Sequence, residues 1–273
     1  MAKVFVSIKD IDHAQFKWVD TRFSLQDADE GKQKYTKSHV TGAVYWDLER
    51  DLSDMTKSEG RHPMPDKSAL IELFRTSGFS IDDQIIVYDD GGSPFATRAW
   101  WLLQYAGFKS SFIALEGFEA MTEAGFPVDN RTTGPQRTLV SPQWDETIYA
   151  PRQFVEETVA GKTASVLLDA RSAERYRGDN EPIDPIAGRI PGALNFDWEQ
   201  LRKEGIFNLD VAVKEQLHTV VKPAAEVTVY CGSGVTAAPL YALLKHNGYE
   251  TARLYVGSYS DWISQKEGIV EKD

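Results

Sequence analysis

The chain has almost no cysteine, with one in 273 residues, and this scarcity excludes several classes of protein. A single cysteine cannot form an intrachain disulfide, and a structural zinc site would need its other ligands from other residue types. No apolar run approaches the ~18 residues that a membrane-spanning helix needs, and the start MAKVFVSIKD carries charges where a signal peptide is apolar. We therefore expect a cytoplasmic protein with no membrane partner and no metal.

Cationic side chains are also scarce, since 30 Lys and Arg stand against 41 Asp and Glu and the net charge is −11. An acidic balance opposes binding to a polyanion, and no Lys/Arg-rich stripe with interleaved aromatic residues is present. No nucleic-acid partner is expected. The length and a hydrophobic fraction of 42% instead indicate a globular protein of two domains.

The sequence contains a long internal repeat. Residues 85–108 (IIVYDDGGSPFATRAWWLLQYAGF) match residues 227–249 (VTVYCGSGVTAAPLYALLKHNGY), and shorter blocks match in the same order: WVDTR with LLDAR, HVTGAVYWDL with RIPGALNFDW, and ALEGF with YVGSY. This order predicts a duplicated domain. We expect a first domain at residues 1–130, a polar, proline-containing linker at 131–145 and a second domain at 146–273.

Short β-branched runs alternate with helical patterns within each half. In the second half we expect strands at residues 165–171, 192–196, 227–231 and 252–256, and helices at 151–161, 211–221, 235–248 and 258–266. Alternation of this kind predicts parallel strands covered by helices on both faces. The expected fold class is α/β, with two small parallel sheets in tandem.

The single cysteine, Cys231, lies at the end of the strand VTVYC, where parallel sheets usually place their ligands. The GSG that follows lets the backbone curl so that N–H groups face inward, and the helix near Val235 points its positive end at the same place. These features favour the anionic form of a thiol. A buried structural cysteine is the alternative, but the matching loop of the first half carries Asp89, so the fold does not require cysteine here.

Two kinds of thiol chemistry fit this loop poorly. A cysteine phosphatase holds phosphate with an arginine six positions after its cysteine, and Ala237 stands at that position. A thiol hydrolase uses a neighbouring histidine, and none of the five histidines lies in the loop. A base from the other domain remains compatible with the sequence.

The chain resembles the two-domain rhodanese-type sulfurtransferases over nearly its whole length. The likeness rests on the tandem repeat, on D-x-R near the start of each half, on GRIPGA at residues 188–193 and on CGSGVTA at residues 231–237. The resemblance implies tandem rhodanese-like domains, of which the first is catalytically silent and the second is catalytic. It further implies that Cys231 takes a sulfane sulfur, becomes a persulfide and gives the sulfur to cyanide, a thiol or a thioredoxin-like acceptor, with no cofactor.

The same loop bears on the sulfur donor. Members of the family that prefer thiosulfate resemble CRKGVT, and those that prefer 3-mercaptopyruvate resemble CG[S/T]GVT, which is the form found here. We expect a small anionic donor, with 3-mercaptopyruvate favoured; thiosulfate sulfur transfer, or a persulfide carrier without turnover, is the alternative. One departure is that the family's second arginine is absent, because EPIDP has Ile183 or Asp184 in its place.

The resemblance also assigns roles to individual residues. Cys231 and Ser233 are expected to be catalytic, and the anion nest is expected to include Gly232, Gly234, Val235 and Thr236. Arg175 is expected to hold the carboxylate of the donor. Arg189 is a candidate for the missing second cation, and Arg98 follows the silent loop in a helix that could face the cleft between the domains.

The remaining candidates concern proton transfer. His39 is expected to join Ser233 in a relay, with Asp27 or Asp29 as its third member. His62, in GRHPMPD, is interpreted as structural. Arg171 also matches the family, but its pattern recurs in the silent half and is interpreted as structural.

Overall fold

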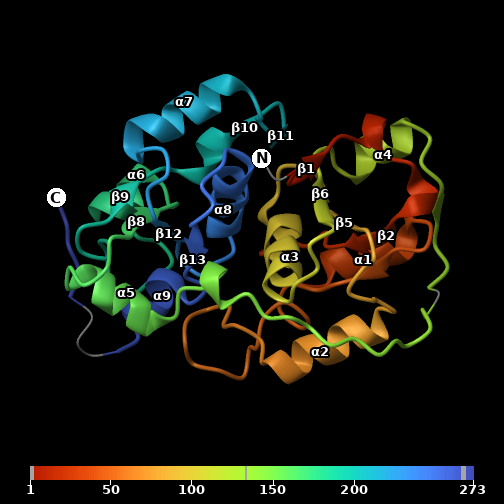
Figure 1. The fold of residues 1–273 in the computed structure, drawn as a ribbon, viewed down its shortest axis with the longest axis horizontal. Helices are drawn as coiled ribbons and strands as arrows, with labels where there is room; N and C mark the ends of the chain where they lie inside the picture. Colours follow the sequence, from red (N-terminus) through yellow and green to blue (C-terminus); the bar gives the residue numbers. More distant parts are fainter. Residues whose placement is uncertain (1–2, 133, 266–268) are drawn as a thin grey trace.

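The computed structural model of the chain describes residues 3–132, 134–265 and 269–273, and it forms two α/β units side by side (Figure 1). The elements of the first unit are β1 (Phe5–Val6), η1 (Ile8–Asp10), η2 (His13–Gln15), β2 (Lys17–Asp20), α1 (Glu30–Lys37), β3 (His39–Val40), β4 (Val44–Tyr45), α2 (Lys67–Thr76), β5 (Ile85–Tyr88), α3 (Pro94–Tyr105), β6 (Ser111–Ala114), α4 (Phe118–Glu123) and β7 (Val128–Asp129).

The second unit repeats the plan of the first. Its elements are η3 (Glu146–Ile148), α5 (Arg152–Val159), β8 (Val166–Asp169), α6 (Ala173–Arg177), β9 (Leu194–Asn195), η4 (Trp198–Leu201), β10 (Arg202–Lys203), β11 (Ile206–Phe207), α7 (Val211–Val220), β12 (Val227–Tyr230), α8 (Ala237–His246), β13 (Arg253–Leu254) and α9 (Ser258–Trp262). The strands and helices expected in this half are all present. The predictions missed α6 and the antiparallel hairpin of β10 and β11, and the last expected helix runs into residues 266–268, outside the described part.

Each unit has one parallel sheet. The strand order is β1-β6-β5-β2-β4 in the first and β13-β12-β8-β9 in the second, and every pairing within these two sheets is parallel. The central pairs have the same register, with Asp20 opposite Tyr88 in one sheet and Asp169 opposite Tyr230 in the other. The α/β class and the duplication are therefore confirmed.

Alternate residues of each central strand face opposite layers of helices, because side chains point to opposite faces at a period of two. In β5, Val87 packs into the same cluster as Phe74 of α2, whereas Tyr88 packs with Met121 of α4. In β12, Val229 packs into the core that includes α7 and α8, and Tyr230 into the core that includes α5 and α9. Helices therefore cover both faces of both sheets.

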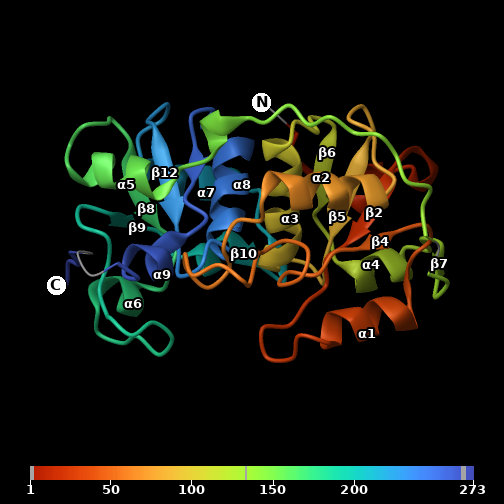
Figure 2. The same ribbon diagram turned by 90° about the horizontal axis from the view of Figure 1, so that it is seen from below.

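The two units share one hydrophobic core. Helices α3 and α8 lie side by side between the sheets in both views (Figures 1 and 2), and the ring of Trp100 lies 6.1 Å from that of Tyr241. Both helices are apolar almost all round, which is typical of buried helices. This packing sets the position of one unit against the other, and with it every contact between them at the site.

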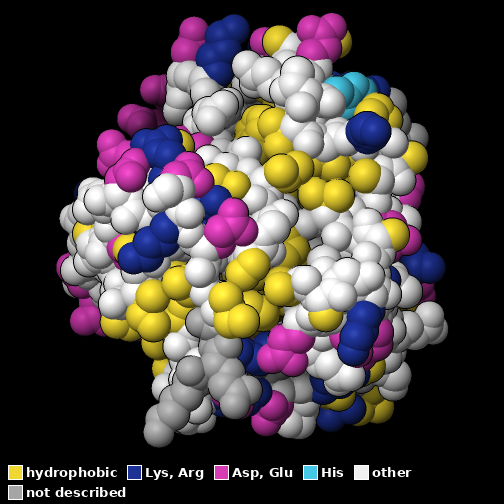
Figure 3. Space-filling view, turned by 90° about the vertical axis from the view of Figure 1, so that its left-hand side faces the viewer, with side chains coloured by type: hydrophobic (Ala, Val, Ile, Leu, Met, Phe, Trp, Pro, Cys, Tyr) yellow, Lys and Arg dark blue, Asp and Glu magenta, His cyan; other side chains and the backbone are white. Residues whose placement is uncertain are grey.

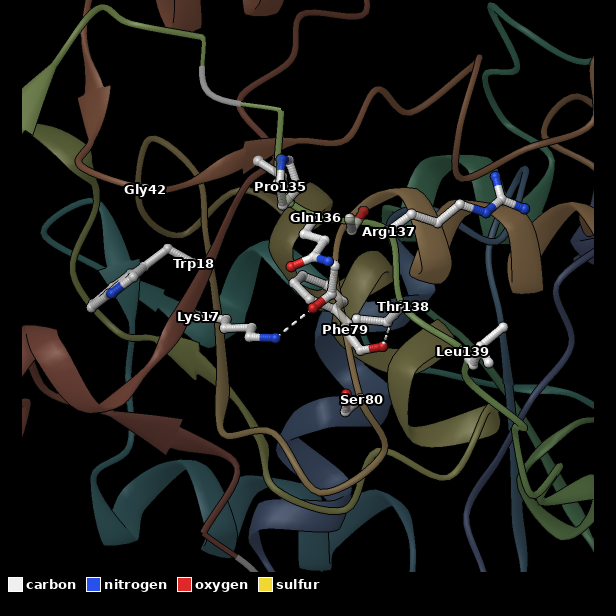
Figure 4. A pocket seen from close by; sticks show the side chains of 13 residues that line it. Lys17, Trp18, Gly42, Phe79, Ser80, Pro135, Gln136, Arg137, Thr138 and Leu139 are labelled. Carbon is white, nitrogen blue, oxygen red and sulfur yellow. Dashed lines mark hydrogen bonds between the residues drawn. The ribbon is translucent and has the colours of Figure 1, made fainter.

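Residues 130–145 contain no helix or strand in their described part and run over the surface of the first unit toward the second (Figure 2). The segment 135–139 closes a cavity of about 650 Å³ against Lys17, Trp18 and Phe79 (Figure 4). Lys17 donates to the carbonyl of Gly78 there. All residues that line this cavity belong to the first unit or to the segment 135–139. The bounds of the linker, residues 131–145, stay a prediction.

Over the described ranges, no helix is long and apolar enough to cross a membrane. On the end face of the second unit, Lys and Arg side chains are interspersed with Asp and Glu and with apolar patches (Figure 3). This face therefore offers no extended surface of a single charge.

A candidate active site at the Cys231 loop

The loop after β12 wraps backbone around the single thiol. Gly234 has φ +74°, a conformation that favours glycine, and its N–H donates to Cys231 Sγ at 3.1 Å. Helix α8 begins at Ala237, two residues later than expected. Cys231 is fully buried, so its sulfur is surrounded by the loop and by neighbouring residues.

The segment after β13 holds this loop from behind. The N–H of Cys231 donates to Ser258 Oγ at 3.1 Å, and the N–H of Tyr259 donates to the carbonyl of Cys231 at 2.9 Å. Ser260 donates in the same way to the carbonyl of Gly232 at 2.9 Å. These hydrogen bonds engage two carbonyls of the loop and the N–H of Cys231, and they hold the loop in the shape in which the Gly234 N–H donates to the sulfur.

The matching loop of the first unit shows what such a backbone accommodates. Asp89 takes the place of Cys231, and its carboxylate accepts from the N–H groups of Gly91 at 2.8 Å and Ala96 at 3.0 Å. Burial raises the pKa of Asp89 to about 7, and these hydrogen bonds oppose the rise. An acidic group thus occupies this position in both copies, and only the second copy has a nucleophile.

The repeated D-x-R pattern is structural, as expected. Arg22 and Asp20 form a buried pair at 2.6 Å in the first unit, and Arg171 and Asp169 form one at 2.7 Å in the second. Each aspartate lies beside a buried tyrosine of the neighbouring strand, and Tyr88 donates to Asp20 at 2.8 Å. These pairs link neighbouring strands below the loops.

The structure brings His62, rather than His39, to Ser233. His62 Nδ1 lies 3.0 Å from Ser233 Oγ, and both side chains are buried. The interpretation of His62 as a structural residue missed this contact. The segment from residue 60 reaches across to the second unit, where the N–H of Arg61 donates to Ser260 Oγ at 3.1 Å.

The expected placement of His39 is wrong. Its ring stacks on Tyr35, its Nδ1 is 2.7 Å from the carbonyl of the same residue, and its Nε2 is 3.5 Å from Asp129. Asp29 lies just before α1, and the N–H of Asp29 donates to the carboxylate of Asp27. His39 thus has its contacts within the first unit, and the side chain that meets Ser233 is His62.

Three titratable side chains of the first unit, His62, Arg98 and Arg61, influence the electrostatics near the Cys231 loop. Burial, together with the nearby positive charges of Arg98 and Arg61, lowers the pKa of His62 to about 4. His62 is therefore neutral at pH 7. Arg98 is fully buried, and burial lowers its pKa to about 10, opposed by interaction with Cys231. Its Nη2 donates to the carbonyl of Leu52 at 3.2 Å, whereas Nε and Nη1 have no hydrogen-bond partner within the described structure.

Two guanidinium groups lie against the backbone next to the thiol. A Cβ atom built on Gly232 would clash with Arg61 Nη2 and lie 3.3 Å from Arg175 Nη2. Arg175 is paired with Glu181 at 2.8 Å and with Asp184 at 2.9 Å, and Arg61 is paired with the other oxygen of Asp184. Arg175, the expected anchor for a donor, thus lies beside the loop, and its charge is engaged by carboxylates of the chain.

Arg189 is not available as the second cation. It pairs with Glu271 at 2.5 Å and with Asp273 at 2.8 Å, and its guanidinium lies 4.4 Å from the ring of Tyr176. These partners hold it near the carboxyl-terminal residues. The second cation beside the loop comes from the first unit, as Arg61.

The lengths of the two repeated halves contain a signal that could have pointed to the segment of Arg61 and His62. The paired residues His39 and Tyr88 are 49 positions apart, whereas their counterparts Arg189 and Tyr230 are 41 apart. The first half therefore has eight additional residues in the interval that contains GRHPMPD. A segment without a counterpart in the other copy is a place to expect a function that the copies do not share.

The fold and the site define a duplicated α/β protein in which one copy carries a nucleophile and the other supplies side chains to it. The family model described as "Rhodanese-like domain" matches residues 7–124 and 152–265. The chain therefore belongs to the rhodanese-like domain family, and it is a sulfurtransferase.

Relatives of known name agree with this assignment. A Pseudomonas aeruginosa protein, provisionally named a 3-mercaptopyruvate sulfurtransferase, is 36% identical over 90% of this chain and 88% of its own length. A Mycobacterium tuberculosis protein, provisionally named thiosulfate sulfurtransferase SseB, is 37% identical over 90% and 87%. The structure of 3-mercaptopyruvate sulfurtransferase from Leishmania major superposes with a TM-score of 0.84 at 27% identity, covering 95% of this chain and 74% of that one.

Proposed function

We propose that the protein takes a sulfur atom from a small anionic donor, with 3-mercaptopyruvate favoured, and carries it as the sulfane sulfur of a persulfide on Cys231. The observation that carries the proposal is the loop itself, in which the Gly234 N–H donates to the only thiol in the chain. A persulfide is an anion, and a curled backbone with inward N–H groups stabilises it as it stabilises a thiolate.

The first half-reaction conserves atoms and charge. The Cys231 thiolate attacks the donor sulfur, an S–S bond forms, the carbon–sulfur bond of 3-mercaptopyruvate breaks, and its electron pair goes to the enolate of pyruvate. The proton that was on the donor thiol ends on the enolate, which gives pyruvate and the persulfide anion. Ser233, hydrogen bonded to His62, is positioned to pass this proton.

In the second half-reaction an acceptor thiolate or cyanide attacks the outer sulfur of the persulfide. The S–S bond breaks, its electron pair returns to Cys231 as the thiolate, and the acceptor leaves with the sulfur. A thiol or a thioredoxin-like protein is the acceptor that we propose, in the cytoplasm, because reducing compartments keep such thiols available.

Two features favour 3-mercaptopyruvate over thiosulfate. The loop itself has Gly232 and Ser233 beside the thiol and contributes no cationic side chain, and the two guanidinium groups that lie against Gly232 are already paired with Asp184. The His62–Ser233 pair supplies a proton path that an enolate needs and that departing sulfite does not. Thiosulfate is the second candidate, since a relative of equal similarity carries its name.

The proposal is tested by measuring sulfur transfer to cyanide with 3-mercaptopyruvate and with thiosulfate, in the native protein and in Cys231→Ala. We expect many turnovers with 3-mercaptopyruvate and none in the variant, because the chain has no second thiol. A single equivalent of product would instead identify a persulfide carrier. Full activity in Cys231→Ala would end the proposal.

A further inference from the structure

Asp184 joins the two domains directly beside the thiol loop. One carboxylate oxygen is paired with Arg61 of the first domain and the other with Arg175 of the second, at 2.9 Å. The Asp184 side chain is only 2% exposed, although the neighbouring Ile183 is 57% exposed. The chain therefore turns Asp184 inward, toward the two guanidinium groups that lie against Gly232.

The charges around this carboxylate are balanced. Arg175 also pairs with Glu181 at 2.8 Å, and Glu181 pairs with Arg171 at 3.1 Å. The cluster contains three guanidinium groups and three carboxylates: Arg61, Arg171, Arg175, Asp169, Glu181 and Asp184. Its formal charge is zero, so a donor anion that entered it would find no uncompensated cation.

The Asp184 carboxylate has the same chemistry as the carboxylate of an α-keto acid. Both are planar groups with two acceptor oxygens, and guanidinium forks bind either one with charge-assisted hydrogen bonds. Asp184 places its oxygens where the two guanidinium groups beside Cys231 converge. A donor carboxylate held by the same two groups has to take the place of Asp184.

We propose that Asp184 is an intramolecular competitor for the donor anion and so determines donor specificity. It raises the KM for donors that carry a carboxylate near their sulfur, and a donor binds by displacing it from Arg61 and Arg175. This proposal rests on the proposed function, because the donor is taken to enter the same site. A purely structural clip between the domains predicts the opposite effect, since its loss would loosen the anchor.

Alkylation of the thiol tests the proposal without sulfur transfer. Iodoacetate carries a carboxylate, and iodoacetamide is its neutral counterpart. Because the chain has a single cysteine, both reagents report on Cys231 alone. The alkylation rate with iodoacetate divided by the rate with iodoacetamide therefore measures how well the cations beside Cys231 bind a carboxylate. We expect the ratio to rise at least about tenfold in Asp184→Asn, in line with charged hydrogen bonds freed by the change. Asp197→Asn is the matched control, since that carboxylate caps η4 in the same domain.

Kinetics give the second readout. With 3-mercaptopyruvate, KM should fall by about tenfold in Asp184→Asn while kcat changes little, because the competitor is removed and the chemistry is not. Adding Arg61→Gln to Asp184→Asn should raise KM again, because one of the two freed cations is then lost. An unchanged or lower alkylation ratio, or a higher KM, would overturn the proposal.

The native protein provides a test that does not depend on a folded variant. Because Asp184 holds the anchor, the ratio for native Cys231 should not exceed that of a free thiol such as glutathione. A much higher ratio would show that the anchor accepts carboxylates freely, and would refute competition by Asp184. If no variant turns over 3-mercaptopyruvate, the donor assignment fails, and the alkylation ratios still decide the role of Asp184.

Discussion

His62 Nδ1 lies 3.0 Å from Ser233 Oγ, and this hydrogen bond joins the silent domain to the loop that carries the nucleophile. The pair exists only when the two domains are packed through α3 and α8. The first domain, whose own loop has Asp89 instead of a thiol, therefore contributes to the site through a neighbouring segment. The copy that has no thiol therefore still lies against the Cys231 loop and contributes a side chain to it.

Replacing Ser233 by alanine should separate the two donors. The proton path to the pyruvate enolate would be broken, so we expect kcat with 3-mercaptopyruvate to fall by about 10²-fold, the lower end for a positioned acid–base group. Transfer from thiosulfate should change much less, because sulfite leaves without a proton. Steady-state kinetics with both donors measure this, with Ser264→Ala as the control; equal losses for both donors would contradict the relay.

The buried His62 should make the folded protein sensitive to acid. Its pKa is lowered from its ordinary value of 6.5 to about 4, so the unfolded chain binds more protons than the folded one between these values. The contribution to stability is complete above pH 6.5 and is lost as the pH falls toward 4, by roughly 3 kcal/mol in total. Urea unfolding at pH 7, 5.5 and 4 should show a smaller loss in His62→Gln than in native protein. Parallel losses in native protein, His62→Gln and the control His218→Gln would count against a buried neutral His62.

The buried positive charge of Arg98 should lower the stability of the folded protein and increase its sulfur-transfer activity. Its guanidinium is fully buried, with two nitrogens that lack partners within the described structure, and it interacts with Cys231. A buried ion carries a desolvation penalty of several kcal/mol, and an apolar side chain of similar length removes that penalty. We expect Arg98→Met to keep or raise Tm while kcat/KM falls by at least about tenfold. Lower Tm with full activity would assign Arg98 to packing alone, and Arg75→Met on α2 serves as the comparison.

The thiol loop should not tolerate a side chain at Gly234. Gly234 and Gly248 both have positive φ, but a Cβ on Gly234 would overlap the carbonyl oxygen of Val256, whereas one on Gly248 would meet nothing within 4 Å. Gly248→Ala should cost only the backbone strain, about 1–2 kcal/mol. Gly234→Ala should cost several kcal/mol of unfolding free energy and abolish transfer, because residue 234 has to shift and its N–H then moves away from Cys231 Sγ. Equal unfolding free energies for the two variants would show that the clash is relieved without cost.

Much of the fold could be predicted because it is encoded locally and twice. Alternating strand and helix patterns predicted the parallel strands of the second half and the helices α5, α7, α8 and α9, and the repeat predicted that the first half has the same plan. The position of Cys231 directly after a strand and before a glycine turn also followed from the sequence, and the carboxyl ends of parallel strands lie at one edge of a sheet. These conclusions depend on neighbours in the sequence and needed no long-range contact.

The partners of the nucleophile depend on packing between segments that are far apart in the chain. His62 and Ser233 are separated by 171 positions, and Arg61 and Asp184 by 123. The sequence alone determined the tandem α/β fold and the thiol loop, because turns and side-chain periodicity are local. Only the tertiary structure decided that His62, rather than His39, meets Ser233 and that Arg61 lies beside Gly232, because the shared core of α3 and α8 sets which loops of the two domains meet.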